Sequence, residues 1–266
     1  MNAVYLQKTG DREAFVRKVF EHFEIRRKVA GKRVLVKPNI VSNEPYPTTT
    51  HPDTVEACLE LLRGLANEVI VADGPAFDAR DPEYLVEEHV LRESCDKYGI
   101  ELLDLLSKGI RKVKTQSLEL EVSLMAFEYD FIISLPVLKT HSVCGMTGAL
   151  KNQLGFLSLS QKSHLHYDGD VHRIIAELNQ VVKPGLHIVD AIQTMVTTNE
   201  VRHGGRTVAL GYMLAGVNPV SLDAVGLELL AKVEPKLKGK RVNDILHIKH
   251  AIEISGWNAI YGLIEW

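Results

Sequence analysis

Short apolar runs alternate with amphipathic stretches along most of this chain. Runs rich in Val, Ile and Leu are typical of buried strands, and they occur at 33–36, 68–72, 100–103, 131–135, 186–189 and 207–214. Apolar residues recur every three or four positions in the stretches between many of these runs. This spacing predicts helices at 11–28, 51–64, 82–98, 168–181, 219–231 and 243–255.

Alternation of strands and helices predicts an α/β fold. We expect a mostly parallel sheet with helices on both faces, in Rossmann-like layers, because parallel strands need crossover helices. The pattern is interrupted at 110–122, where two apolar segments flank the polar turn Thr115–Ser117 and predict a small β-arm. Another interruption, at 192–206, has no hydrophobic spacing and is typical of a linker.

The length of 266 residues fits a single α/β domain over 1–266, with a C-terminal subdomain over 185–266 as the alternative. The tail at 257–266 is apolar and packs either on its own chain or on a second subunit, which leaves a homodimer open.

The composition excludes several classes of protein. A net charge of −3 lacks the basic footprint of a nucleic-acid-binding protein. No apolar run is long enough for a membrane span, and the charged N-terminus does not resemble a secretory signal. Cys58, Cys95 and Cys144 are far apart, which favours a reducing, cytoplasmic location. Without a C-x-x-C pair, we expect no intrinsic iron–sulfur cluster.

Polar side chains follow four of the predicted strands. The strand ends are Lys37-Pro38-Asn39, Asp73-Gly74, Lys139-Thr140-His141 and Asp190. Ligands of open parallel sheets bind at the carboxyl ends of strands, so we expect a shared site. Lysines indicate a small anionic ligand, and His141 and Asp73 are candidates for proton transfer or for orienting it.

Two further segments are candidates for anion binding. In His141-x-x-x-Gly145-x-Thr147-Gly148-x-x-Lys151-Asn152, backbone N–H groups and an ammonium could hold an anion, although the order is not that of a P-loop. The alternative is a glycine turn that enters a helix. Thr48, Thr49, Thr50 and His51 precede a predicted helix, where they either contact the ligand or cap the helix.

A run of histidines and aspartates suggests a divalent metal. His164, His166, Asp168 and Asp170 lie close together in the sequence, and Asp190 is a further candidate ligand. The alternative is an ordinary polar loop. Asp223 lies within a predicted helix, where a structural role is favoured.

Several of these motifs resemble one family over 33–232. The chain is similar to the domain of unknown function 362 in Lys37-Pro38-Asn39, Thr50-His51-Pro52, Asp73-Gly74-Pro75, Pro136-x-x-Lys139-Thr140-His141, Thr147-Gly148-x-x-Lys151-Asn152-x-x-Gly155 and Asn218-Pro219 with Asp223-Ala224. Some members of that family carry ferredoxin-type segments. The resemblance therefore implies a redox or maturation role beside an iron–sulfur partner protein.

Residues 130–151 also resemble the core of the nickel-pincer lactate racemase family. That resemblance implies acid–base or hydride chemistry at His141 and cofactor binding at Lys151. The second catalytic histidine of that family would follow Gly74, where this chain has Pro75, Ala76 and Phe77. Two-base racemisation and a nickel cofactor are therefore not expected.

Three functions remain open at this level. The first is an isomerase-like or oxidoreductase-like enzyme that acts on a small carboxylate or phosphate by His-assisted proton or hydride transfer. The second is a non-catalytic binding protein for an anionic metabolite or cofactor. The third is the redox or maturation partner of an iron–sulfur protein.

Overall fold

A computed structural model describes residues 2–74, 76, 78–79, 88–167 and 169–266, with the backbone alone at 2 and 165–167. Its strands are β1 (Asn2–Lys8), β2 (Arg33–Lys37), β3 (Glu68–Asp73), β4 (Leu102–Asp104), β5 (Ile110–Lys114), β6 (Glu119–Ser123), β7 (Phe131–Ser134), β8 (Lys139–His141), β9 (Gly145–Thr147), β10 (Leu186–Val196), β11 (Arg206–Gly216) and β12 (Tyr261–Glu265). Its α-helices are α1 (Arg12–His22), α2 (Ile25–Val29), α3 (Pro52–Leu62), α5 (Leu91–Tyr98), α6 (Met125–Glu128), α7 (Leu159–Tyr167), α8 (Val171–Val181), α9 (Pro219–Leu230) and α10 (Leu246–Ser255), and a 3-10 helix spans Lys151–Phe156.

Eight strands form one sheet in the order β12-β1-β11-β10-β7-β2-β3-β4. Strand β11 is antiparallel to both of its neighbours, and every other pair is parallel. The prediction of an α/β fold with a mostly parallel sheet is confirmed. The β-arm is confirmed as the antiparallel pair of β5 and β6.

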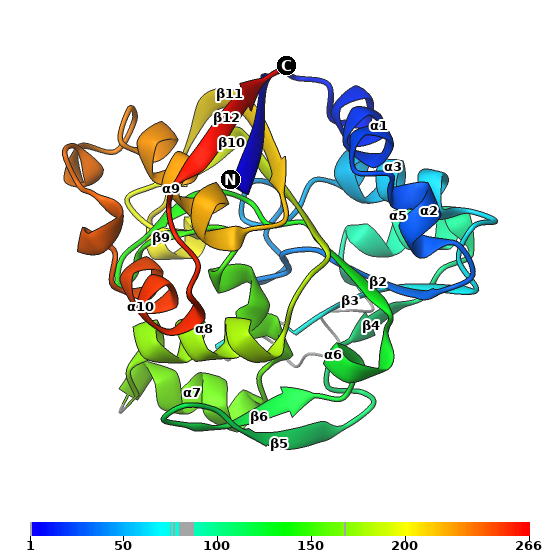
Figure 1. The fold of residues 1–266 in the computed structure, drawn as a ribbon, viewed down its shortest axis with the longest axis horizontal. Coiled ribbons are helices and arrows are strands. Elements are labelled where there is room, and N and C mark those ends of the chain that lie inside the picture. The colour runs from blue at the N-terminus through cyan, green and yellow to red at the C-terminus, as the bar shows by residue number, and fades with distance from the viewer. Residues whose placement is uncertain (1, 75, 77, 80–87, 168) are drawn as a thin grey trace.

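Helices cover both faces of the sheet (Figure 1). Side chains alternate along β2, so Val34 and Val36 pack with α1, α3 and α5, whereas Leu35 packs with α8 on the other face. Burial on both faces explains why the central strands are almost continuously apolar.

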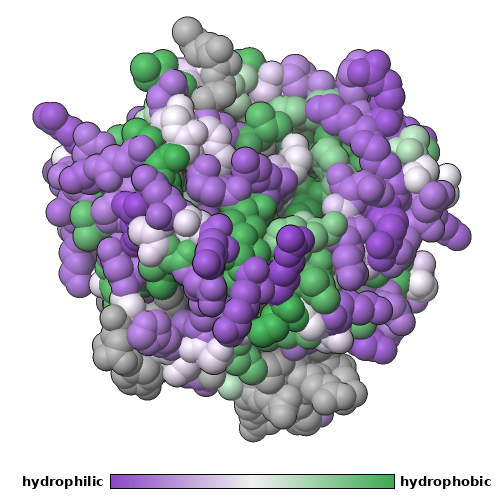
Figure 2. Space-filling view, turned by 60° about the horizontal axis from the view of Figure 1, so that its bottom comes forward, coloured by the Kyte–Doolittle hydropathy of each residue, from purple (hydrophilic) through white to green (hydrophobic). Residues whose placement is uncertain are grey.

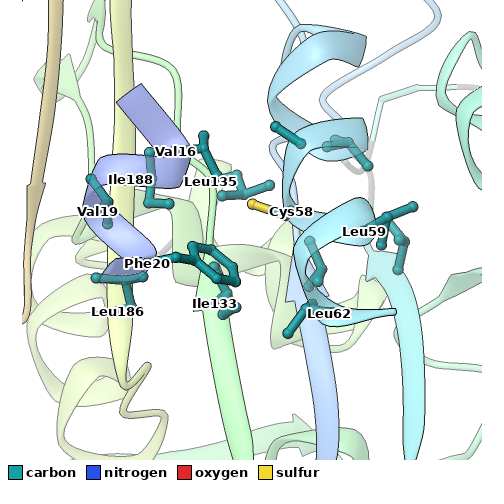
Figure 3. Packing of buried hydrophobic residues seen from close by; sticks show 14 of the residues in the cluster. Val16, Val19, Phe20, Cys58, Leu59, Leu62, Ile133, Leu135, Leu186 and Ile188 are labelled. Atoms are coloured by element: carbon teal, nitrogen blue, oxygen red, sulfur yellow. The ribbon is translucent and has the colours of Figure 1, made fainter. Parts of the chain in front are cut away.

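The first of these faces shows how the core is built. Val16 and Phe20 of α1 and Leu62 of α3 point toward Ile133 and Ile188 of the sheet (Figure 3). Each such side chain is at most 2% exposed, and burial of one contributes roughly 2 kcal/mol. On the face seen in Figure 2, hydrophilic residues cover most of the surface and apolar residues gather toward the middle.

The first and last strands of the chain lie side by side at one edge of the sheet. β12 pairs in parallel with β1 (Figure 1). The Trp266 ring packs against Tyr5 and Phe15. The apolar tail therefore docks on its own chain. Neither β1 nor β12 was predicted. β12 is a short edge strand, and such strands carry little periodic signal.

Two other segments differ from the sequence-based prediction. The stretch at 192–206 is not a linker, because it includes the ends of β10 and β11 and the turn between them. Helix α7 was not predicted. Within the described part of the chain, no helix is long and apolar enough to cross a membrane.

Candidate functional site

A cavity of about 580 Å³ lies where four parallel strands end. Asn39 follows β2, Asp73 ends β3, Lys139 and His141 follow β7, and Thr197 follows β10. The carboxyl ends of parallel strands share one edge of a sheet, which explains why these distant segments meet. The predicted site residues that line the cavity are Asn39, Asp73, Lys139, His141, Thr147, Lys151 and Asn152.

A buried ion pair supports one wall. Lys37 Nζ lies 2.7 Å from Asp73 Oδ1 and donates to the Pro38 carbonyl at 2.9 Å. The Asp73 carboxylate also accepts from the N–H groups of Ile40 at 2.6 Å and Gly74 at 2.8 Å. Burial lowers the pKa of Lys37, and Asp73 partly offsets this effect. These bonds hold the loops after β2 and β3 together, and the catalytic role of Asp73 stays a prediction.

Two glycines allow this wall to pack closely. A Cβ on Gly155 would lie 2.0 Å from Asp73 Oδ1 and 3.1 Å from Lys37 Nζ. A Cβ on Gly74 would lie 2.3 Å from the Gly155 carbonyl oxygen and 2.6 Å from Lys162 Nζ. Both are below normal van der Waals contact, so these positions need glycine.

Two further lysines are buried in the wall. Lys139 Nζ donates to Asn39 Oδ1 at 2.7 Å and to the Thr48 carbonyl at 2.5 Å, and burial lowers its pKa to about 7. Lys162 Nζ donates to the Gly74 carbonyl at 3.0 Å, and burial lowers its pKa to about 8. Sequence reasoning missed Lys162, because helix α7 lacks the hydrophobic spacing that would have identified it.

His141 is held in a defined orientation. Its Nδ1 accepts from the backbone N–H groups of Val143 at 3.1 Å and Cys144 at 3.2 Å. The neutral ring therefore carries its proton on Nε2 and acts there as a donor. In this arrangement the neutral ring of His141 presents a hydrogen-bond donor at Nε2.

Lys151 and Asn152 begin the 3-10 helix beside His141. Among the described residues, the Lys151 ammonium has neither a hydrogen bond nor an ion pair. Asn152 Nδ2 donates to Ser134 Oγ at 2.9 Å, while its buried Oδ1 has no partner within the described structure. An unpaired cation and an unpaired acceptor therefore lie on one wall.

The predicted anion nest is filled by the protein itself. Asp223 of α9 accepts from the N–H groups of Ala149 at 2.6 Å and Leu150 at 3.1 Å, and burial raises its pKa to about 7. A Cβ on Gly148 would lie 2.3 Å from Asp223 Oδ1. Gly148 thus serves internal packing and does not line the cavity. Gly145, with φ of 76°, is the first residue of β9 and ends the turn that follows β8.

The threonines before α3 face inward. Thr50 Oγ1 donates to the Leu135 carbonyl and accepts from Asn39 N, both at 2.7 Å. Thr49 Oγ1 lies 3.4 Å from His89 Nε2, and His51 caps α3. None of the three lines the cavity, and the cap of α3 is His51 and not a threonine. Thr140 lines an adjoining cavity of about 290 Å³.

Two of the predicted metal ligands, Asp190 and His164, lie in different surroundings. Asp190 binds Arg12 Nε at 2.7 Å and accepts from the Tyr46 hydroxyl at 2.7 Å, whereas His164 is exposed on α7. The His166 side chain and Asp168 lie outside the described residues. Within the described part of the chain, no three His, Cys, Asp or Glu side chains form a metal-binding group. Among the described residues there is therefore no set of side chains that would hold a nickel ion.

The turn between β10 and β11 supplies the wall that sequence reasoning missed. Its cavity-lining residues include Thr197, Asn199, Glu200 and His203. Glu200 pairs with Arg202 Nε at 2.6 Å, and Thr197 has a positive φ of 76°. Such a conformation is strained for a β-branched residue. Polar composition was the only signal, and it is equally typical of a linker.

Comparison with solved structures confirms the fold. Lactate racemase apoprotein from Thermoanaerobacterium thermosaccharolyticum is similar with a TM-score of 0.57 and 15% identity, over 86% of this chain and 57% of that chain. At this identity the likeness concerns the fold alone. It agrees with the resemblance noted at 130–151.

Sequence comparisons place the chain in a family. It is 26% identical over 207 residues to the thylakoid-associated protein sll1697 of Synechocystis sp.. That match covers 75% of this chain and 63% of the relative, so the chain spans less than two thirds of its length. The model of the domain of unknown function 362 matches residues 34–228. The chain therefore belongs to the family of the domain of unknown function 362.

Proposed function

We propose that this protein is an enzyme that binds a small carboxylate or phosphate in the 580 Å³ cavity and transfers a proton to or from it. One observation carries the proposal: the oriented imidazole of His141 and the unpaired ammonium of Lys151 line the same cavity. An imidazole and an ammonium that line one cavity form a combination suited to acid–base catalysis of an anionic substrate.

The positions of the side chains in the cavity suggest a separate role for each of them. Lys151 attracts the anionic end of the substrate, and Lys139 and Lys162 add positive charge from the wall behind it. His141 Nε2–H donates to the oxygen on which negative charge develops, where a fixed donor contributes most. Because a proton transfer leaves the oxidation state of the substrate unchanged, the corresponding reaction class is isomerase-like chemistry beside a carboxylate or phosphate. No step in this scheme requires a metal.

Deuterium exchange tests the proposal, because it reports proton transfer whatever the product of the reaction is. Small carboxylic acids and phosphate esters are incubated with the protein in D₂O, and incorporation is followed by mass spectrometry. We expect exchange with at least one compound, and about a 100-fold or greater loss in His141→Gln, typical of a lost acid–base group.

The matched control for His141→Gln is His250→Gln, because His250 lies on α10 and pairs with Glu253 at 3.2 Å. Melting temperatures of both variants should stay close to that of the wild type. Full exchange in His141→Gln would remove this residue from the mechanism. Ligand binding without exchange across the panel would favour the non-catalytic binding protein.

The remaining expectations stay predictions. They are the cytoplasmic location, the homodimer and the iron–sulfur partner protein. All three cysteines are buried in this fold.

A further inference from the structure

We propose, on the basis of the function above, that the substrate is a carboxylate or phosphate with a hydrocarbon chain, and that this chain extends past His141 into the adjoining cavity of about 290 Å³. The anionic end then lies at Lys151, the reacting atom at His141 and the chain beyond it. This order follows from the wall that the two cavities share, because His141 is part of it.

The two cavities lie side by side. Lys151 lines only the larger cavity, whereas Leu246 lines only the smaller one. The residues that line both are His141, Ser142, Val143, Thr197 and Lys236. They come from three separate segments of the chain, as is typical of two cavities that open into each other. A single ligand can therefore contact Lys151, then His141, then the smaller cavity.

Apolar side chains form a large part of the lining of the smaller cavity. Cys144, Leu237 and Ile245 belong to one buried cluster and are at most 4% exposed. Val143 and Leu246 lie on the same cavity and are 62% and 46% exposed. Apolar side chains that gather around a cavity are typical of a site that binds the apolar part of a ligand.

The acidic groups of the smaller cavity are engaged with the backbone. Glu234 accepts from the N–H groups of Thr197 at 2.8 Å and Lys236 at 3.2 Å. Asp244 accepts from the N–H group of Arg241 at 2.7 Å. Because these hydrogen bonds already stabilise both carboxylates, a ligand without a positive charge suits this cavity.

The basic groups leave the apolar part of the lining uncharged. Lys236 and Lys240 are exposed, so their ammonium groups can stay in water while a chain lies against their stems. Burial lowers the pKa of His172, which favours its neutral ring at pH 7. A hydrocarbon chain therefore fits the smaller cavity better than a second charged group.

Chain length tests the inference. Straight-chain carboxylates from acetate to octanoate, and alkyl phosphates from methyl to hexyl phosphate, are compared by isothermal titration calorimetry at pH 7.5. We expect the affinity in at least one series to rise roughly threefold with each methylene group that enters the smaller cavity, and to level off once that cavity is full. Equal affinity of the shortest and longest members would overturn the inference and leave anion binding standing. Absence of binding by both series would overturn both proposals.

Variants assign the gain in affinity to the smaller cavity. Leu246→Trp should fill it and reduce the gain over the whole series to less than about threefold, with the shortest member bound as in the wild type. Val217→Trp is the matched control, because Val217 is 49% exposed and lines neither cavity. If Leu246→Trp does not fold, Leu246→Asp replaces it, since an acidic residue in the first turn of α10 suits the helix and places a charge beside the chain. A gain that survives the substitution would show that the chain lies elsewhere, and would overturn the inference.

Discussion

Gly155→Ala should destabilise this protein far more than an ordinary glycine-to-alanine change. The new Cβ would lie 2.0 Å from Asp73 Oδ1, 3.0 Å from Lys37 Cε and 3.1 Å from Lys37 Nζ. The carboxylate cannot retreat freely, because Ile40 N and Gly74 N hold it at 2.6 and 2.8 Å. Either the ion pair separates or the backbone at 155 moves away from it.

The magnitude follows from burial. Lys37 is 0% exposed and Asp73 is 2% exposed, so water cannot replace the partner that each would lose. Breaking a buried pair costs about 3–5 kcal/mol, and partial relaxation of the backbone lowers this figure. We therefore expect Gly155→Ala to reduce the free energy of unfolding by about 3 kcal/mol.

Urea unfolding followed by far-UV circular dichroism measures this loss. Gly10→Ala is the matched control, because no atom lies within 4 Å of a Cβ at that position, and it should change the free energy of unfolding by less than about 0.5 kcal/mol. The m-value should remain constant in both variants. If Gly155→Ala is as stable as Gly10→Ala, the close packing against the ion pair is refuted.

Two further changes test the cavity wall. The pKa of Lys139 is about 7 in the folded protein and near 10.5 in the unfolded chain, so the unfolded chain binds the extra proton and stability rises with pH between these values. Urea unfolding at pH 7.5 and 8.5 measures how much the free energy of unfolding increases per pH unit. Lys139→Met should lower this increase by about 1 kcal/mol per pH unit. An unchanged increase would show that Lys139 is not the titrating group. Thr197→Gly should raise the melting temperature, because glycine relieves about 1 kcal/mol of backbone strain at φ of 76°. A lower melting temperature would show that the contacts of the threonine side chain stabilise the protein by more than this strain destabilises it.

Local hydrophobic patterns in the sequence were sufficient to predict most strands of the sheet. Val34–Val36 and Phe131–Leu135 are apolar almost without interruption, and a strand covered on both faces needs that composition. The convergence of Asn39, Lys139 and His141 also followed from the sequence. Once the strands are parallel, their carboxyl ends must share an edge.

The sequence could not predict in the same way which buried polar groups pair with each other. Asp190 and Arg12 are 178 positions apart, and nothing near either residue indicates that they form a pair. The N–H groups of Ala149 and Leu150 belong to a motif that is suited to binding an external anion, yet both donate to the carboxylate of Asp223. Burial makes these pairings necessary, because an unpaired polar group inside a protein is costly.

Hydrophobic spacing alone was enough to establish the layered architecture and the edge of the sheet at which polar side chains gather, since it reflects which side of each element is buried. The packed chain was needed to show which of those side chains are already paired, as Asp73 is with Lys37, and which remain available, as Lys151 does. The difference is physical: periodicity is a property of neighbouring residues, whereas charge compensation depends on distances between segments that only folding brings together.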